Sequence, residues 1–360
     1  MGRSIKMKHN RIIGTLLSLA CAAPLLSAQA KSPVAAVLLS EFIEAAPQDP
    51  EVHASSITEV SPGVLLAAWF GGAMEADNDT QIWASRHTEA GWGKAFVVEQ
   101  GLSEDGSKPE PVYNPSLYTH KDGRITVFYM VGPWKGSKRY CMKESLDGGA
   151  TWSKENRVPK GLRGPCRAPT LRLSDGSLLF PTTGSGGVLC NWSDEEMTPD
   201  SWGKSALIAD PEKMSAIQPT LMEKNDGAVL LFARTYAREI GVARSSDRGR
   251  TWGAIKGTGI YMANSGIDVL KLKDGRALLA YNKSDKPADP SKWGNRTPLT
   301  LAVSVDDGEN WRDLFNLETD DIREGFAYPT LIQASDGLVH LTYTWGRKRI
   351  KHVVIDPEKL

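Results

Sequence analysis

The stretch Gln218-Pro-Thr-Leu-Met-Glu-Lys-Asn-Asp226-Gly227-Ala-Val-Leu-Leu-Phe-Ala-Arg234 combines a polar start, an apolar strand, a tight turn and a second apolar strand. The chain of 360 residues follows this plan six times, at intervals of 47–63 residues. The repeats begin at His53, Asn114, Arg167, Gln218, Ser265 and Tyr328. This interval is typical of a four-stranded propeller blade, so the sequence predicts an all-β fold, a six-bladed β-propeller.

A turn signal follows each repeat start after about eight residues. It is Ser61-Pro62-Gly63 in the first repeat and Asp-Gly in the others, at 122–123, 175–176, 226–227, 274–275 and 336–337. Because glycine accepts positive φ at no steric cost, we expect two-residue hairpins here. The apolar stretches that follow are the expected second strands, at 65–70, 125–130, 177–180, 228–233, 276–281 and 339–344.

A second repeated pattern, Ser-x-Asp-x-Gly-x-(Thr/Asn)-Trp, occurs at 145–152, 245–252 and 304–311, with weaker copies at 85–92 and 193–202. The Asp carboxylate can accept backbone N–H bonds inside a turn, the Gly supplies a left-handed residue, and the Trp packs under the hairpin. We therefore interpret the pattern as structural.

With these boxes the sequence resembles the sialidase (neuraminidase) superfamily, whose Asp-box, or BNR, repeats have this form, and in particular its bacterial predicted-neuraminidase branch. The resemblance covers roughly residues 50–352. Asp boxes also occur in binding propellers, so they indicate the fold rather than the substrate.

The two ends of the chain are expected to meet. The last repeat has room for only three strands, the third at 350–355, whereas the apolar segment 34–42 precedes the first repeat without a partner. We expect that segment to supply the missing outer strand and to cover an exposed sheet edge.

Residues 1–30 read as a secretory signal peptide. Four basic residues precede an apolar run over 12–26, and Ala28-Gln-Ala30 offers a cleavage site after Ala30. The run is short for a membrane span. We expect a secreted or periplasmic protein, a monomer, whose propeller occupies 31–360.

Charge and cysteine content exclude several partners and cofactors. Beyond residue 30 the chain carries 39 basic and 43 acidic side chains, so nothing suggests a nucleic-acid or membrane-surface partner. Cys141, Cys166 and Cys190 allow at most one disulfide, and Cys166 reads as a buried small hydrophobe. No spacing resembles a metal site, and no cofactor is expected.

The repeat starts should face one another at the channel mouth, because the innermost strands of a propeller converge there. The superfamily resemblance assigns roles to some of them. Tyr328 matches its nucleophilic Tyr, while Arg234 and Arg296 match its second and third carboxylate-binding arginines. A guanidinium fork gives bidentate bonds to a carboxylate.

Two positions depart from the superfamily pattern. His53 replaces its first arginine, and Gln218 replaces the Glu that assists the Tyr. A Gln cannot take a proton, so Tyr328 needs another group to activate it. Arg167 is a candidate substitute clamp or a cation that lowers the Tyr pKa.

Acidic and amide side chains complete the candidate set. The superfamily's acid/base Asp lies in the loop that here contains Glu75, Asp77 and Asp79, and the sequence does not choose among them. Asn114 and Asp268 are candidate substrate-binding residues, although Asp268 is equally a candidate buried anchor.

Three functions fit these residues, all with a glycan that carries a carboxylate-bearing sugar. The first, which we favour, is a metal-independent, retaining exo-glycosidase of the sialidase type, acting on a terminal sialic or related ulosonic acid. The second is a polysaccharide lyase on uronate-containing glycans, with His53 and Tyr328 as base and acid and with Arg167 and Gln218 neutralising the uronate. The third is a non-catalytic glycan-binding propeller.

Overall fold

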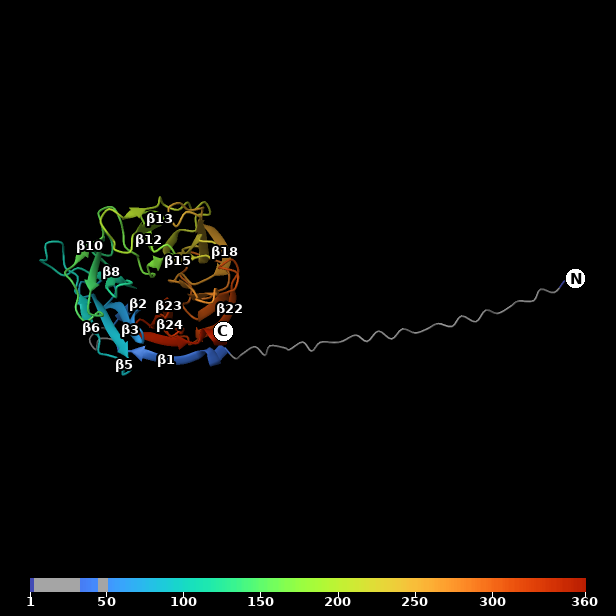
Figure 1. Cartoon of the computed structure of the whole chain (residues 1–360), viewed down its shortest axis with the longest axis horizontal. Helices are drawn as coiled ribbons and strands as arrows, with labels where there is room; N and C mark the ends of the chain where they lie inside the picture. The colour runs from blue at the N-terminus through green and yellow to red at the C-terminus, as the bar shows by residue number, and fades with distance from the viewer. Residues whose placement is uncertain (3–32, 45–50) are drawn as a thin grey trace. The chain divides into compact units, whose positions relative to one another are not determined.

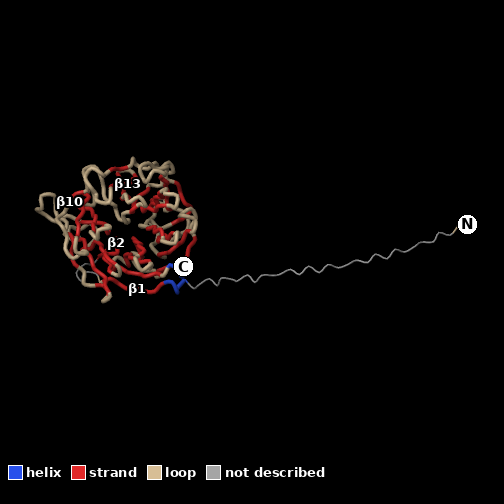
Figure 2. Tube along the Cα trace, viewed as in Figure 1, coloured by secondary structure: helices blue, strands red, loops and turns tan. Residues whose placement is uncertain are grey.

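A computed structural model describes residues 1–2, 33–44 and 51–360. The described residues form six antiparallel sheets around a ring, so the predicted six-bladed β-propeller is confirmed (Figures 1 and 2). Apart from Met1 and Gly2, the expected signal peptide lies outside these residues. None of the helices within the described part of the chain is long and apolar enough to cross a membrane.

Each blade is one antiparallel meander. Blade 1 contains β2 (Glu51–Ser61), β3 (Val64–Gly72), β4 (Gln81–Thr88), β5 (Gly91–Trp92) and β6 (Phe96–Glu99). Blade 2 contains β7 (Val112–Thr119), β8 (Ile125–Val131), β9 (Arg139–Ser145) and β10 (Asn156–Arg157). Blade 3 contains β11 (Leu171–Arg172), β12 (Leu178–Gly184), β13 (Gly187–Ser193) and β14 (Gly203–Lys204).

The remaining blades follow the same order. Blade 4 contains β15 (Ala216–Glu223), β16 (Val229–Thr235), β17 (Glu239–Ser245) and β18 (Lys256–Tyr261). Blade 5 contains β19 (Asp268–Lys271), β20 (Ala277–Tyr281), β21 (Leu299–Ser304) and β22 (Arg312–Glu318). Blade 6 contains β23 (Phe326–Gln333), β24 (Val339–Trp345), β25 (Arg349–Ile355) and β1 (Val37–Ile43). Two 3-10 helices, η1 (Pro33–Ala36) and η2 (Pro357–Lys359), flank this set.

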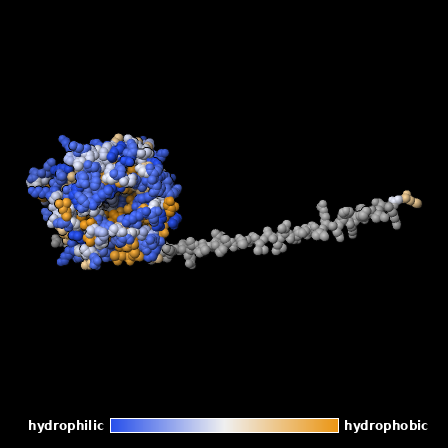
Figure 3. All heavy atoms as spheres, viewed as in Figure 1, coloured by the Kyte–Doolittle hydropathy of each residue, from blue (hydrophilic) through white to orange (hydrophobic). Residues whose placement is uncertain are grey.

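The hydrophobic core lies between the blades. Phe232 of blade 4 packs in one cluster with Leu279 of blade 5, for example, and both are buried. In the space-filling view the outer surface is mainly hydrophilic, and hydrophobic atoms show inside the central hollow (Figure 3).

The Asp-Gly hairpins differ from the expected two-residue form. In blade 2, His120 N–H donates to the Arg124 carbonyl and Gly123 N–H to the His120 carbonyl, which leaves three residues in the loop. Gly123 alone of these three has positive φ. The Asp122 carboxylate accepts the Arg124 N–H at 2.9 Å and fixes this turn. This side-chain bond explains why the three-residue loop replaces the two-residue turn.

The Asp boxes have the local geometry that their sequence predicts. Asp247 accepts the Thr251 N–H at 2.8 Å and the Thr251 hydroxyl, while Trp252 Nε1 donates to the Gly249 carbonyl at 3.0 Å. Each box also contacts the preceding blade, because a Cβ added at Gly249 would lie 2.9 Å from Leu179 Cδ1 of blade 3.

The expected latch strand is present. β1 pairs with β25 over Val37–Ile43, beside the C-terminal strands (Figure 1). Glu41 of β1 lies 3.1 Å from His352 Nδ1, and Trp92 of blade 1 donates to the same nitrogen at 3.3 Å. Burial lowers the pKa of His352 to about 4, so the ring is neutral at pH 7. Strand β1, strand β25 and the first blade therefore meet at one histidine.

The cysteines do not hold this fold together. Cys141, Cys166 and Cys190 are buried and free. Burial raises the pKa of the Cys166 thiol, which agrees with its expected role as a small hydrophobe.

Gly249 and Gly227 offer a matched pair for testing the inter-blade contact. Both have φ of +79°, but nothing lies within 4 Å of a Cβ at Gly227. We expect Gly227→Ala to lower the unfolding free energy by about 1 kcal/mol through φ strain alone. Gly249→Ala should cost a further ~1–3 kcal/mol through overpacking against Leu179. Equal melting temperatures of the two variants would contradict the proposed contact.

Candidate active site

Four inner strands contain, as their third or fourth residue, a residue whose backbone is left-handed. These are Ala54, Asn114, Gln218 and Tyr328, with φ of 55, 50, 47 and 57°. A register shift accompanies each of them in β2, β7, β15 and β23. A β-bulge of this kind bends the strand and re-aims a side chain. The bulges thus set the direction of the polar residues that open these repeats.

The Tyr328 phenol oxygen receives two hydrogen bonds. Arg234 Nη1 donates to it at 2.9 Å and Gln218 Nε2 at 3.1 Å. Gln218 Oε1 accepts from the same Arg234 nitrogen at 2.8 Å, which orients the amide. Burial by itself raises the pKa of Tyr328, but the charges of Arg234 and Arg296 and the Gln218 hydrogen bond lower the pKa below 10 overall. The surroundings therefore favour the phenolate.

Arg234 and Arg296 both lie beside this phenol, but they differ in their hydrogen-bond partners. Arg234 ends β16, is 3 % exposed, and donates through Nε to Asn264. Arg296, in the loop before β21, has its guanidinium carbon 5.8 Å from the Tyr328 ring centroid. No hydrogen bond or ion pair joins the Arg296 guanidinium to another described side chain. Arg296 therefore has donors available for an anionic ligand.

His53 packs directly on the Tyr328 ring. The ring centroids are 4.3 Å apart, and His53 Nδ1 lies 3.0 Å from Thr344 Oγ1. Burial, followed by the charges of Arg347 and Arg296, holds the pKa of His53 well below 6.5. The imidazole is therefore neutral near pH 7 and can accept a proton.

The acidic loop between β3 and β4 distinguishes its three carboxylates. Glu75 forms an ion pair of 2.7 Å with Arg347, and its charge raises the pKa of Tyr328, against the effect of the arginines. Asp79 instead accepts the Ala73 N–H at 3.1 Å and shapes the loop. The Asp77 side chain makes no hydrogen bond or ion pair with the described residues. Of the three, Glu75 is the one whose charge reaches the phenol.

Arg347 belongs to this site, and the sequence analysis did not identify it. It has φ of 56° and also lies 3.7 Å from carboxylate oxygens of Glu51 and Glu324. A cavity of about 400 Å³ is lined by Trp293, Gly294, Asn295, Arg296, Glu324 and Arg347. The sequence could have indicated Arg347 through its position just after a second strand, in the β24–β25 hairpin. This position corresponds to that of Arg234 near the end of β16.

Arg167 and Asp268 lie in the floor of the channel. The Arg167 side chain has no exposed surface, because its Nη1 donates to the Pro329 carbonyl at 2.8 Å and its Nη2 to the Ile267 carbonyl. The structure thus does not present Arg167 to the channel as a clamp. Asp268 accepts the Thr220 hydroxyl at 2.6 Å and the Leu331 N–H at 2.9 Å, which makes it a buried anchor.

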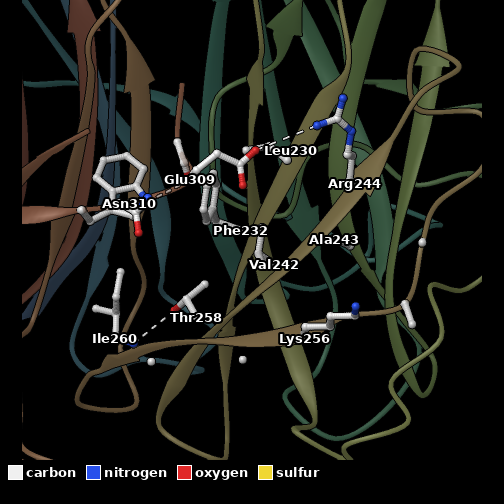
Figure 4. Close-up of a pocket in the computed structure, with 16 residues that line it drawn as sticks. Leu230, Phe232, Val242, Ala243, Arg244, Lys256, Thr258, Ile260, Glu309 and Asn310 are labelled. Atoms are coloured by element: carbon white, nitrogen blue, oxygen red, sulfur yellow. Dashed lines mark hydrogen bonds and ion pairs between the residues drawn. The ribbon is translucent and has the colours of Figure 1, made fainter. Parts of the chain in front are cut away.

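Asn114 stands apart from these contacts. It is partly buried at the start of the inner strand of blade 2, and its side chain makes no hydrogen bond to the described residues. A larger groove, of about 770 Å³, lies between blades 4 and 5 and includes Phe232, Arg244, Lys256 and Glu309 (Figure 4). No predicted site residue lines that groove.

Six blades with Asp boxes around an arginine–tyrosine cluster define a sialidase-like propeller. The model of the BNR repeat-like domain family matches residues 63–341, which is more than half of the chain. The chain belongs to this family.

Solved structures agree with this fold, whereas no curated protein matched the sequence. A protein of unknown function from Dyadobacter fermentans is 18% identical, with a TM-score of 0.71 over 89% of this chain and 98% of that one. NanB sialidase from Streptococcus pneumoniae is 15% identical, with a TM-score of 0.70 over 89% and 71%. An intramolecular trans-sialidase from Ruminococcus gnavus is 14% identical, with a TM-score of 0.69 over 92% and 99%. At these identities the likeness establishes the fold alone.

The environment of His53 predicts how it titrates. Because burial and the neighbouring arginines hold its pKa well below 6.5, we expect the imidazole to stay neutral as the pH falls from 7.5 to 6. Imidazole ¹⁵N chemical shifts measure this directly, and His53→Gln assigns the signal. A resonance that titrates with a midpoint near 6.5 and vanishes in His53→Gln would contradict the burial argument.

Proposed function

We propose that this protein is a secreted or periplasmic exo-glycosidase of the sialidase type, which removes a terminal sialic or related ulosonic acid from glycans with retention. The observation that carries this proposal is the pair of hydrogen bonds that Arg234 and Gln218 donate to the Tyr328 oxygen. Two donors and adjacent cations lower the pKa of the phenol, which makes it easier to ionise without a neighbouring base. Gln218 can then replace a Glu, because the lowered pKa lets the phenol lose its proton to water more readily, although a Glu at this position would take the proton directly.

The proposed reaction has two displacements at the anomeric carbon. The Tyr328 phenolate attacks this carbon, and the bond to the glycosidic oxygen breaks with its electron pair remaining on that oxygen, which takes a proton from Glu75 in its protonated carboxylic acid form. Water then attacks the same carbon, gives its proton to the Glu75 carboxylate, and the phenolate leaves with the electron pair of its C–O bond. Two inversions give retention.

Arg296 and Arg234 are the proposed carboxylate clamp. Arg296 has unpaired donors beside the phenol, and Arg234 fixes the phenol oxygen from the other side. A sugar carboxylate bound here would neutralise Arg296 and place the anomeric carbon near Tyr328. This arrangement replaces the first arginine of the superfamily, whose position His53 occupies.

Glu75 is the proposed acid/base for two reasons. Its charge reaches Tyr328, and Arg347 holds its carboxylate in one orientation. Asp79 is committed to the loop backbone through Ala73. Asp77 remains the carboxylate without a partner in the described structure, so it is the comparison residue for mutation.

A uronate lyase is the second candidate, and the neutral His53 favours it. An unprotonated imidazole against the Tyr328 ring could abstract the proton next to a uronate carboxylate. One residue of this alternative fits poorly, because Arg167 is occupied by two backbone carbonyls. The uronate would have to be neutralised by Arg296 instead.

The mass of the product separates these candidates, because hydrolysis adds water and elimination does not. For the glycosidase we expect Tyr328→Phe to reduce cleavage by at least about 100-fold with the fold intact. Gln218→Glu should raise turnover by restoring a proton acceptor, and His53→Ala should keep residual activity. Loss of activity in both Gln218→Glu and His53→Ala, together with an unsaturated product from the wild-type protein, would establish the lyase. Retained glycan binding without any product would leave only the binding propeller.

The clamp predicts a strong preference for arginine over lysine at position 296. Because a point charge cannot reproduce two charge-assisted bonds, we expect Arg296→Lys to lower kcat/KM roughly 10- to 100-fold. Arg323→Lys is the control, since Arg323 is almost fully exposed and pairs only with the adjacent Glu324 among the described residues. Steady-state kinetics on a sialoside should show no change for this control. Equal kinetics of both variants would remove Arg296 from the clamp.

A further inference from the structure

Arg167 crosses the channel floor from one side of the ring to the other. It precedes β11 in blade 3, but its guanidinium donates to the Ile267 carbonyl at the start of blade 5 and to the Pro329 carbonyl of blade 6. These partners lie 100 and 162 residues further along the chain. One side chain therefore joins three blades beneath the candidate site.

We propose that Arg167 is a positioning residue for Tyr328, which fixes the left-handed start of β23 through the Pro329 carbonyl and keeps a positive charge under the phenol ring. This inference rests on the proposed function only for its effect on turnover. Its effect on the Tyr328 phenol can be measured without a substrate.

The backbone of Tyr328 needs such support. Its φ is 57°, and Pro329 follows directly. A non-glycine residue in the left-handed region carries strain of about 1–2 kcal/mol, and the residue before a proline is normally extended. Strain of this kind persists only when the surrounding structure over-determines the conformation. The hydrogen bond from Arg167 to the Pro329 carbonyl holds the 329–330 peptide unit, which lies one unit beyond the peptide that joins the strained residue to the proline.

The space between Arg167 and Tyr328 is filled. A Cβ added at Gly266 would lie 3.1 Å from Arg167 Nε and 3.3 Å from Tyr328 Cδ1. The Arg167 guanidinium carbon is 5.5 Å from the Tyr328 ring centroid, within the range of a cation–π contact. Because Gly266 has no side chain, the Arg167 guanidinium and the Tyr328 ring can both pack against this residue. We call this arrangement the shared layer.

The charge of Arg167 has a defined electrostatic role. Burial lowers the pKa of Arg167, whereas the charges of Asp268 and then Tyr328 raise it and so stabilise the charged guanidinium. The charged and polar groups around Tyr328 are Arg167, Arg234, Arg296, Gln218, His53 and Glu75. Of the arginines in this set, Arg167 is the one that has no exposed surface, so neither solvent nor substrate screens it.

A fixed charge and a fixed position are tested by different variants. Arg167→Met removes both, whereas Arg167→Lys keeps the charge but can bond only poorly to two carbonyls at once. Arg163→Met is the matched control. Arg163 comes from the same segment, donates to the Thr183 carbonyl and lies 5.3 Å from the Tyr140 ring, so it reproduces these contacts away from Tyr328.

The measurement is the titration of Tyr328 by NMR of ζ-¹³C-tyrosine, with Tyr328→Phe to assign the signal. Because the Arg167 guanidinium carbon lies 5.5 Å from the Tyr328 ring centroid, in Arg167→Met we expect the Tyr328 titration to move to higher pH. In Arg167→Lys we expect it to stay near the wild-type value while kcat falls and KM changes little. Arg163→Met should leave both the titration and the kinetics unchanged.

A folded Arg167→Met protein in which Tyr328 titrates as in the wild type would overturn the proposal. If Arg167→Met does not fold, Gly266→Ala takes its place, because the added methyl crowds both groups without removing a charge. A displaced Tyr328 resonance in Gly266→Ala supports the shared layer, and an unchanged resonance overturns it. If the wild type cleaves no sialoside yet Arg167→Met moves the titration, the proposed function fails and this inference stands.

Discussion

The left-handed backbone of Tyr328, held directly before a proline, is the constraint on which the candidate site depends. Equivalent bulges set the direction of Gln218 and Asn114, so one conformational device aims side chains from three blades. The strain is sustained by hydrogen bonds between the inner strands, such as Thr330 Oγ1 to the Ser55 carbonyl at 2.8 Å and Leu117 N–H to Ser56 Oγ at 2.9 Å. The closed ring therefore fixes each strand start from both neighbours, as a single hairpin could not.

Under the proposed function, the residue beside the tyrosine nucleophile donates a hydrogen bond to the phenol oxygen, whereas a base at that position would accept the phenol proton. Gln218 donates to the phenol oxygen and the charges of Arg234 and Arg296 lower the pKa of the phenol, so under the proposed function the surroundings would assist ionisation of Tyr328 without a base at position 218. Buried cations are costly unless they are compensated, and here the phenol helps to compensate Arg234 and Arg296. A neutral sugar would leave Arg296 without a counter-charge, whereas a sugar carboxylate supplies one. Under the proposed function, the carboxylate of the substrate would compensate the same cations that lower the pKa of Tyr328.

The sequence was sufficient for the fold because each blade obeys local rules. Repeat starts, turn glycines and Asp boxes depend on residues within about ten positions, and the pairing of the N-terminal strand followed from counting strands. Contacts between distant blades were not accessible in this way. The Arg167 side chain is oriented by hydrogen bonds to the backbone carbonyls of Ile267 and Pro329. Every residue has such a carbonyl, so the residue types do not reveal these bonds. Arg347 was missed because it follows Gly346 in a hairpin rather than opening a repeat. The loop carboxylates could be separated only when their partners, Arg347 and the Ala73 N–H, were placed.

The latch also orders events during synthesis. β1 is the first strand of the propeller to be made, yet its hydrogen-bonding partner, β25, is the last. Until β25 has been made, both β1 and β24 have an unpaired edge, which is a template for aggregation. A propeller without β25 cannot form this pair, so the ring closes only after residues 349–355 have been made.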